Sequence, residues 1–275
     1  MLTLIIALVV LALVAGFVGS LSGLGGGMFI VPALVIFAHV PMKVAVGASL
    51  MAVVATSAGA SVAFVRDGWT NIKVAIVLEC ATVTGAIAGA LLAGVASTTF
   101  LELLFALVML QSAYFSFRKR DSEPLARSDY LCNRLGLSGS FPDCNGVPVS
   151  YGVANLPGGA ALMTLAGLMS GLLGIGSGAL KVIAMDQIMH LPLKVSSATS
   201  NFMIGVTAGA GAMVFLARGD ILPTIAAPVS LGVAAGAIAG SKLLPYANVR
   251  WLRAGFVVIL VFIAAEMGWR AITGV

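Results

Sequence analysis

Charged side chains are scarce in this sequence. Only 9% of its 275 residues are Asp, Glu, Lys or Arg, and 60% are hydrophobic, whereas a soluble domain carries about 25% charged residues. The stretches 1–41, 82–97 and 221–241 contain none of these four residue types. A helix needs about 20 mainly apolar residues to cross a bilayer. The composition therefore excludes an ordinary soluble domain and predicts an all-α polytopic membrane protein.

Cysteine and histidine are also rare. The three cysteines, Cys80, Cys132 and Cys144, show no CxxC spacing and no even count, so free thiols are expected, with a structural disulfide as the alternative. With two histidines in the whole chain, no metal site is expected. No cofactor and no nucleic-acid partner are expected either. The start, Met1-Leu2-Thr3, lacks the basic region of a signal peptide, so residues 3–20 are predicted to be a retained helix.

The sequence repeats itself at one constant offset, without gaps. Glycines in the first half recur as glycines in the second, and the motif HxPxK occurs once in each half. The matched pairs include Gly16/Gly167, Gly23/Gly174, Gly25/Gly176, Gly27/Gly178, His39/His190, Pro41/Pro192, Lys43/Lys194, Ser49/Ser200, Thr56/Thr207, Gly85/Gly236 and Gly89/Gly240. Chance similarity between apolar helices would not keep a single register over this length, so an internal duplication is predicted.

The duplication divides the chain into an N-terminal membrane repeat (1–117), a polar linker (118–154) and a C-terminal membrane repeat (155–275). Each repeat holds five apolar segments, which gives about 8–10 membrane segments in all. They are 3–20, 25–38, 44–65, 73–96 and 100–117, then 155–174, 176–189, 195–216, 222–244 and 250–271. The second segment of each repeat is short and follows a glycine cluster, which predicts a broken or re-entrant helix.

Basic residues predict the orientation. If the halves are inverted repeats, eleven of the basic residues fall on the side of the linker, and only Lys43, Arg218 and Arg270 fall on the other. Positively charged loops stay in the cytoplasm. The linker 118–154 is therefore expected in the cytoplasm, with both termini outside the inner (cell) membrane. Parallel halves would divide the basic residues more evenly. The basic run 118–120 is interpreted as a topology signal, with regulation as the alternative.

The paired glycine clusters are the first candidate binding site. Glycine is costly inside a helix and lets the backbone unwind, and a helix that restarts after such a break presents free N–H groups to an anion. Transporters place such breaks at matching positions of both halves. Close helix packing is the competing interpretation. The substrate-binding candidates here are Ser22, Gly25, Gly26, Gly27, Gly176, Ser177 and Gly178.

Polar side chains near the start of each repeat's third segment extend this candidate site. They are Ser49 in the first half and Thr199, Ser200 and Asn201 in the second. They could donate hydrogen bonds to anion oxygens, although such hydroxyls often bond only their own helix backbone.

Ionisable residues at membrane depth are functional candidates by default. Lys181 follows the second glycine cluster and could balance the charge of a bound anion, unless its stem simply reaches the interface. Asp186 and Glu79 are candidates for coupling transport to protons, and an interfacial position is the alternative for Glu79. His39 and His190 are weighed as proton relays against inherited turns at the membrane surface.

These motifs resemble those of the sulfite exporter TauE/SafE family. The resemblance is carried by Gly19-Ser-Leu-Ser-Gly-Leu-Gly-Gly-Gly27 with Phe29-Ile-Val-Pro32, by Met169–Lys181, and by Ser196-Ser-Ala-Thr-Ser-Asn201. It covers nearly the whole chain and implies export or uptake of sulfur-containing anions such as sulfite or organosulfonates. The halves differ, because Gly26 is opposite Ser177 and Ile30 is opposite Lys181, so an asymmetric site is expected.

The sequence thus predicts a secondary transporter of a small sulfur-containing anion, and not an enzyme. An anion channel for small oxyanions or carboxylates is the alternative, because the same site could serve it. An intramembrane enzyme ranks lower, since no membrane HExxH motif and no nucleophile–base pair is found. Partners are limited to the anion, the bilayer and a coupling ion, and the oligomeric state is open.

Overall fold

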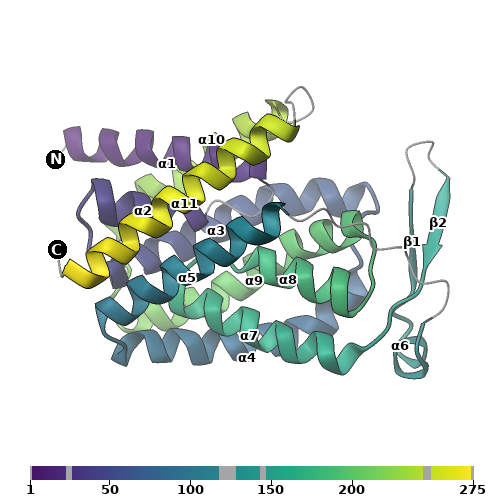
Figure 1. Cartoon of the computed structure of the whole chain (residues 1–275). Helices are drawn as coiled ribbons and strands as arrows, with labels where there is room; N and C mark the ends of the chain where they lie inside the picture. The colour runs from purple at the N-terminus through teal and green to yellow at the C-terminus, as the bar shows by residue number, and fades with distance from the viewer. Residues whose placement is uncertain (1, 23–26, 118–127, 143–146, 244–248, 274–275) are drawn as a thin grey trace.

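The computed structural model describes residues 2–22, 27–117, 128–142, 147–243 and 249–273, and these ranges are mostly helical (Figure 1). The first repeat contains α1 (Leu2–Ser22), α2 (Gly27–Phe37), α3 (Met42–Arg66), α4 (Ile72–Val95) and α5 (Thr98–Phe117). The second contains α7 (Leu156–Leu173), α8 (Gly178–Ile183) with the π-helix η1 (Ala184–Ile188), α9 (Leu193–Ala217), α10 (Pro223–Leu243) and α11 (Val249–Thr273). The ten segments predicted from the sequence are therefore helical.

The linker is folded, and here the all-α prediction is incomplete. It contains a short helix, α6 (Tyr130–Arg134), and an antiparallel hairpin of β1 (Gly139–Pro142) and β2 (Pro148–Tyr151). In the hairpin Gly139 lies opposite Tyr151. Four-residue strands rich in Pro, Gly and Ser give no clear period-two signal, so the polar composition pointed to a loop.

Within the described residues, four helices are long and apolar enough to cross a membrane: α3, α4, α7 and α9. Shorter apolar stretches lie in α1, α2, α5 and α10. Large hydrophobic side chains are widely exposed on the outside of the bundle, for example Leu231 at 72% and Ile76 at 61%. Such side chains would be unfavourable in water and suit contact with lipid tails.

Small residues bring equivalent helix pairs into close contact. A Cβ atom on Gly85 of α4 would collide with the carbonyl oxygen of Thr164 on α7, and one on Gly236 of α10 would collide with that of Leu13 on α1. In the alignment of the two halves, Gly85 matches Gly236 and Leu13 matches Thr164. The same packing is therefore built twice, once between α4 and α7 and once between α1 and α10. Without a hydrophobic driving force in lipid, such close approach is how membrane helices associate.

Helices α3 and α9 each have 25 residues and pack against each other in opposite directions. Gly205 lies against Ser57, whereas the later Gly211 lies against the earlier Leu50. The Ser57 hydroxyl also donates to the carbonyl oxygen of Asn201 at 2.5 Å. These two helices occupy equivalent positions in the repeats, so they form the central antiparallel pair of the bundle.

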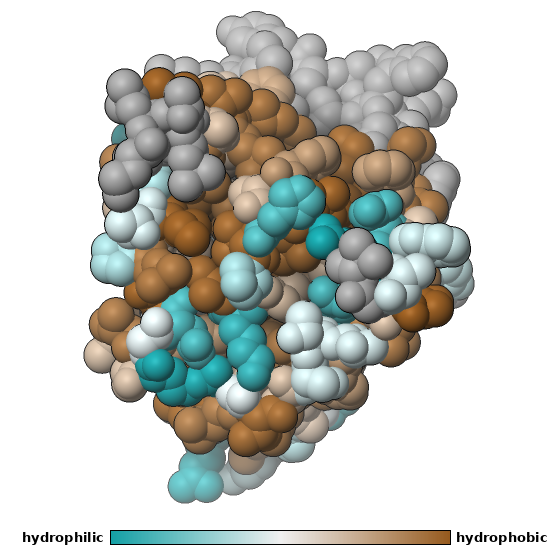
Figure 2. All heavy atoms as spheres, turned by 90° about the vertical axis from the view of Figure 1, so that its left-hand side faces the viewer, coloured by the Kyte–Doolittle hydropathy of each residue, from teal (hydrophilic) through white to brown (hydrophobic). Residues whose placement is uncertain are grey.

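The two ends of the bundle differ. Figure 1 shows the start of α1 and the end of α11 at one end, and the β1–β2 hairpin at the other. Viewed from the terminal end, hydrophilic residues gather over the central and lower part of the face, with hydrophobic residues around them (Figure 2). This end holds the three basic residues expected there, and each donates to a backbone carbonyl oxygen: Lys43 to Gly94, Arg218 to Ala90 and Arg270 to Val35.

Candidate functional site: the helix breaks

The second-half break separates α7 from α8. Helix α7 ends with Gly174 in the left-handed region (φ 69°), and Gly176 and Ser177 are also left-handed (φ 75° and 45°) before α8 begins at Gly178. Left-handed backbone favours glycine, and a Cβ on Gly174 would lie 2.8 Å from the carbonyl oxygen of Val46. The predicted interruption of this helix is therefore present, and the glycines permit both its conformation and its close packing.

The start of α2 lies against the second-half break. Gly27, the first residue of α2, is so close to this break that a Cβ there would lie 2.8 Å from the carbonyl oxygen of Gly174 and 3.2 Å from that of Ile175. Val53 of α3 contacts both Gly27 and Gly176, and Ile204 of α9 contacts Gly176. Both contact residues lie near the midpoints of their 25-residue helices, so Gly27 and the second-half break meet about halfway along α3 and α9.

A serine supports each break in the same way. The Ser49 hydroxyl of α3 donates to the carbonyl oxygen of Gly27 at 3.3 Å and to that of Gly174 at 2.8 Å. The Ser200 hydroxyl of α9 donates to the carbonyl oxygen of Gly178, also at 3.3 Å. Each hydroxyl has a single proton, and in this conformation it points at these backbone carbonyl groups. Of the three, only that of Gly174, at the end of α7, lies where a helix leaves its carbonyl groups without an intrahelical partner.

Lys181 is fully buried and belongs to a chain of three polar groups from three helices. Its ammonium donates to the Thr207 hydroxyl of α9 at 2.5 Å, and that hydroxyl lies 2.6 Å from a carboxylate oxygen of Glu79 on α4. Thr207 therefore bridges a cation and an anion that form no direct ion pair within 4 Å. This arrangement holds the ammonium of Lys181 three residues after the start of α8 at Gly178.

Asp186 is the other fully buried charged residue of this region. It lies on η1, the π-helical continuation of α8, and neither carboxylate oxygen has a hydrogen-bond partner among the described residues. The hydroxyl of Ser177 at the break is also buried without a partner. Buried polar atoms without a hydrogen-bond partner are rare in folded proteins, so each of them needs a physical explanation.

Four candidates lie away from the breaks. The Thr199 hydroxyl accepts from the backbone N–H of Asn71, and the Asn201 amide donates to Ser197 of its own helix. His39 and His190 are both exposed with positive φ (51° and 57°), in equivalent turns before α3 and α9. A further three candidates cannot be placed: Gly25, Gly26 and the side chain of Ser22 lie outside the described residues.

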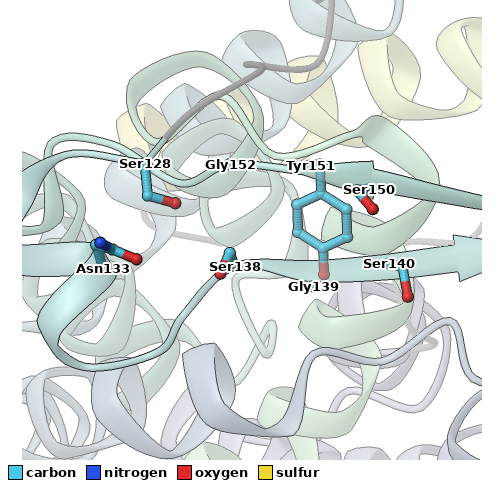
Figure 3. A pocket seen from close by; sticks show the side chains of 8 residues that line it. All are labelled: Ser128, Asn133, Ser138, Gly139, Ser140, Ser150, Tyr151 and Gly152. Atoms are coloured by element: carbon cyan, nitrogen blue, oxygen red, sulfur yellow. The ribbon is translucent and has the colours of Figure 1, made fainter.

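A polar pocket of about 510 Å³ lies in the linker, distant from the helix breaks in the fold. Its polar lining residues are Ser128, Asn133, Ser138, Ser140, Ser150 and Tyr151 (Figure 3). The Tyr151 ring stands beside it, its hydroxyl receives a 2.9 Å hydrogen bond from Asn71, and burial raises the pKa of this phenol. Nearby Cys132 is a buried free thiol and Cys80 an exposed one, whereas Cys144 lies outside the described residues.

Two structural residues were missed as candidates from the sequence. Thr207 had been matched to Thr56 in the repeat, but nothing in one sequence showed that it would face both Lys181 and Glu79. Asn71 caps α4 through Val74, and its amide also reaches the carbonyl oxygen of Leu137 in the linker. Only its position before a long apolar segment hinted at a capping role.

The family of this chain follows from its match to a known protein family. The model of the sulfite exporter TauE/SafE family matches residues 8–267. The chain belongs to the TauE/SafE family. It is a membrane transporter by that membership, as the resemblance in the sequence predicted.

Curated relatives agree with the family. A probable membrane transporter, YunE of Bacillus subtilis (strain 168), is 30% identical over 223 residues, which cover 78% of this chain and 80% of the relative. YdhB of the same organism is 24% identical over 238 residues (86% and 88%), and ORF9 of Sinorhizobium sp is 24% identical over 261 residues (94% and 90%). Both are also named probable membrane transporter proteins. No solved structure matches the chain significantly.

Proposed function

We propose that this TauE/SafE transporter carries a small sulfur-containing anion, such as sulfite or an organosulfonate of the sulfoacetate type, across the inner membrane. The observation that carries the proposal is the contact of Gly27, at the start of α2, with the second-half break, with the fully buried Lys181 three residues beyond that break. A buried cation inside the membrane is costly, which makes it a functional candidate. An anion bound there would be attracted by the ammonium of Lys181 and could accept hydrogen bonds from the backbone N–H groups at the start of the restarted helix.

Individual residues then have separate roles. Lys181 supplies the positive charge, and the backbone at Gly27, Gly176 and Gly178 approaches the anion closely because these residues have no side chain. The Ser177 hydroxyl, buried without a partner among the described residues, is available to donate to the anion. Ser49 and Ser200 position that backbone by holding the carbonyl groups of Gly27, Gly174 and Gly178. Gly25, Gly26 and the side chain of Ser22 lie outside the described residues and stay candidates from the sequence alone. The contacts of Ser49 and Gly27 with Gly174 draw both halves into the proposed site.

The halves are proposed to be inverted repeats that rock about the central pair. The antiparallel packing of α3 and α9, which are equivalent helices, supports inversion. The shared 3.3 Å contact of Ser49 with Gly27 and of Ser200 with Gly178 supports the equivalence of the halves. Because α2 has only 11 residues and the α8–η1 segment spans only residues 178–188, each is shorter than the about 20 residues of a membrane crossing and is proposed to be re-entrant. Alternating access would arise when the two repeats separate first on one side of the breaks and then on the other.

The direct test is a binding panel on the purified protein with sulfite, sulfate, thiosulfate, sulfoacetate and acetate. Lys181→Ile places in the second half the residue that the first half already buries as Ile30 (0% exposed), so the fold has a precedent for it. We expect this variant to lose about tenfold or more in affinity for the sulfur anions, about 1.4 kcal/mol. Lys181→Arg should keep part of the affinity.

The matched control is Lys194→Met. Lys194 lies over the Trp69 ring, with its ammonium 5.0 Å from the ring centroid, at the linker end of the bundle. Anion affinity should not change in this variant. The role of Lys181 would be rejected if Lys181→Ile bound each anion as tightly as wild type does. It would also be rejected if affinity fell only in proportion to the loss of folded protein. A preference for acetate over every sulfur compound would reject the substrate class.

A further inference from the structure

The buried charges around Lys181 do not balance once Glu79 of the first repeat is included. Lys181 and Asp186 are both fully buried, and Glu79 reaches Lys181 through Thr207. The ammonium of Lys181 is therefore compensated by the carboxylate of Glu79. Asp186 is left as a second carboxyl group with no cation of its own.

The surroundings of Asp186 supply no other compensating group. The π-helix that carries it packs against α7, α8 and α9. Helix α7 has no titratable side chain, α8 has Lys181, and α9 has Lys194 at its start, whose ammonium lies over Trp69. His190, which follows this π-helix in the sequence, is exposed. Within the described residues, neither oxygen of Asp186 receives a hydrogen bond.

A carboxylate in this position is unfavourable, and a substrate anion would make it more so. Removing an unpaired charge from water costs several kcal/mol, and a second negative charge near Lys181 adds repulsion. A neutral carboxylic acid avoids both costs. Loading an anion beside Lys181 is therefore favoured when Asp186 holds a proton.

The fold does not require an acidic residue here. In the first repeat the equivalent position is Val35, which is also buried (4% exposed), within the regular helix α2. The second repeat differs in two ways at once: the residue is Asp186, and the helix is π-helical, with the Met189 N–H bonded to the carbonyl oxygen of Ala184 at 3.1 Å. π-Helical turns are rare and are frequent at functional sites.

We propose that Asp186 is the proton-binding residue that couples anion transport to a proton gradient, which rests on the proposed anion site at the breaks. On the loading side its carboxylate takes one proton from water and becomes a carboxylic acid as the anion binds. On the other side the anion leaves and the proton returns to water. No bond of the substrate forms or breaks. Anion and proton therefore cross together, in the direction set by their combined gradients.

The test uses the full chain in liposomes with radiolabelled thiosulfate, which does not titrate near neutral pH, and an internal pH dye. In wild type, a pH gradient alone should concentrate thiosulfate on the alkaline side, and an imposed thiosulfate gradient should move protons with it. Asp186→Asn, which has the same shape and cannot titrate, should lose both effects. Asp67→Asn is the matched control, because Asp67 is an exposed partner of Arg66, and it should behave as wild type.

Each outcome has a distinct meaning. If Asp186→Asn still follows the pH gradient as wild type does, the proposal is overturned, while the anion site stands. If wild type carries none of the anions, the proposed function fails and the coupling proposal with it. If Asp186→Asn does not fold, a calorimetric measurement on wild type takes the place of the variant. Thiosulfate binding is then measured in buffers of different ionisation enthalpy, which reports the number of protons taken up on binding. Proton uptake on binding supports the proposal, and binding without proton uptake overturns it.

Discussion

At the scale of single residues, the interior of this transporter depends on a few polar atoms that have defined partners. The Thr207 hydroxyl is the central one, because it accepts from Lys181 and lies within hydrogen-bond distance of Glu79. Inside lipid-embedded protein a lost partner is not replaced by bulk water. Removing this one hydroxyl group should therefore lower the stability of the protein more than the loss of a single small group at the surface would.

Thr207→Val keeps the shape of the side chain and removes this hydroxyl. We expect the free energy of unfolding to fall by about 1–3 kcal/mol, because the buried charges of Lys181 and Glu79 lose their common partner. Thr207→Ser should restore most of it. The readout is the melting temperature in detergent, together with anion affinity.

The repeat provides the control, Thr56→Val. Thr56 is equivalent to Thr207 in the first half, but its hydroxyl donates only to Val53 in its own helix. A change within about 0.5 kcal/mol is expected there. If both substitutions cost the same, the bridge between Lys181 and Glu79 has no energetic importance.

At the scale of helices, glycine decides which elements can touch. Gly85 and Gly89 of α4 let this helix approach the backbone of α7, and Gly167 and Gly171 do the same from the other side. Close approach maximises dispersion contacts between helices in lipid. These glycines serve packing, whereas Gly174 and Gly176 serve the break, which agrees with the two interpretations kept open for glycine in the sequence.

Gly85→Ala should separate α4 from α7, because the new methyl group would collide with the carbonyl oxygen of Thr164. We expect a loss of about 1–3 kcal/mol in the free energy of unfolding, measured as a lower melting temperature. Gly59→Ala is the control, since a Cβ on this exposed glycine of α3 meets nothing within 4 Å. It should be neutral or stabilising by up to about 1 kcal/mol, and an equal loss in both would refute the packing role.

At the scale of the whole molecule, the proposed inversion predicts opposite exposure of two equivalent turns. His39 lies near the end where Lys43 reaches Gly94, whereas His190 follows Met189, whose carbonyl oxygen accepts from Ala154 of the linker. In a background without the three native cysteines, His39→Cys should react with an impermeant maleimide in intact cells. His190→Cys should react only after permeabilisation.

Parallel repeats would give the same reaction for both positions, so this experiment decides the topology directly. Both histidines are exposed and have similar positive φ angles, which makes the two variants a matched pair. Labelling in the reversed order would keep the inversion but place the linker outside, against the distribution of basic residues.

Composition and spacing along the chain were enough to predict the membrane environment, the ten helical segments and the family, and they also predict the internal repeat. These features depend on local composition and on spacing along the chain, which a single sequence contains in full. Lys181 was found in the same way, as a charge within an apolar segment. The hairpin of the linker was not, because its short strands lack a clear period.

Which of these residues lie together depends on how the helices pack. Gly27 and Gly174 are far apart in the sequence, as are Lys181 and Glu79. The packing of α3, α4 and α9 brings the first pair into contact and links the second pair through Thr207. Thr199 looked equivalent to its neighbour Ser200, yet it faces Asn71 while Ser200 faces the break. Successive residues of a helix point in different directions, so the helix rotation set by packing determines which hydroxyl lies at the break.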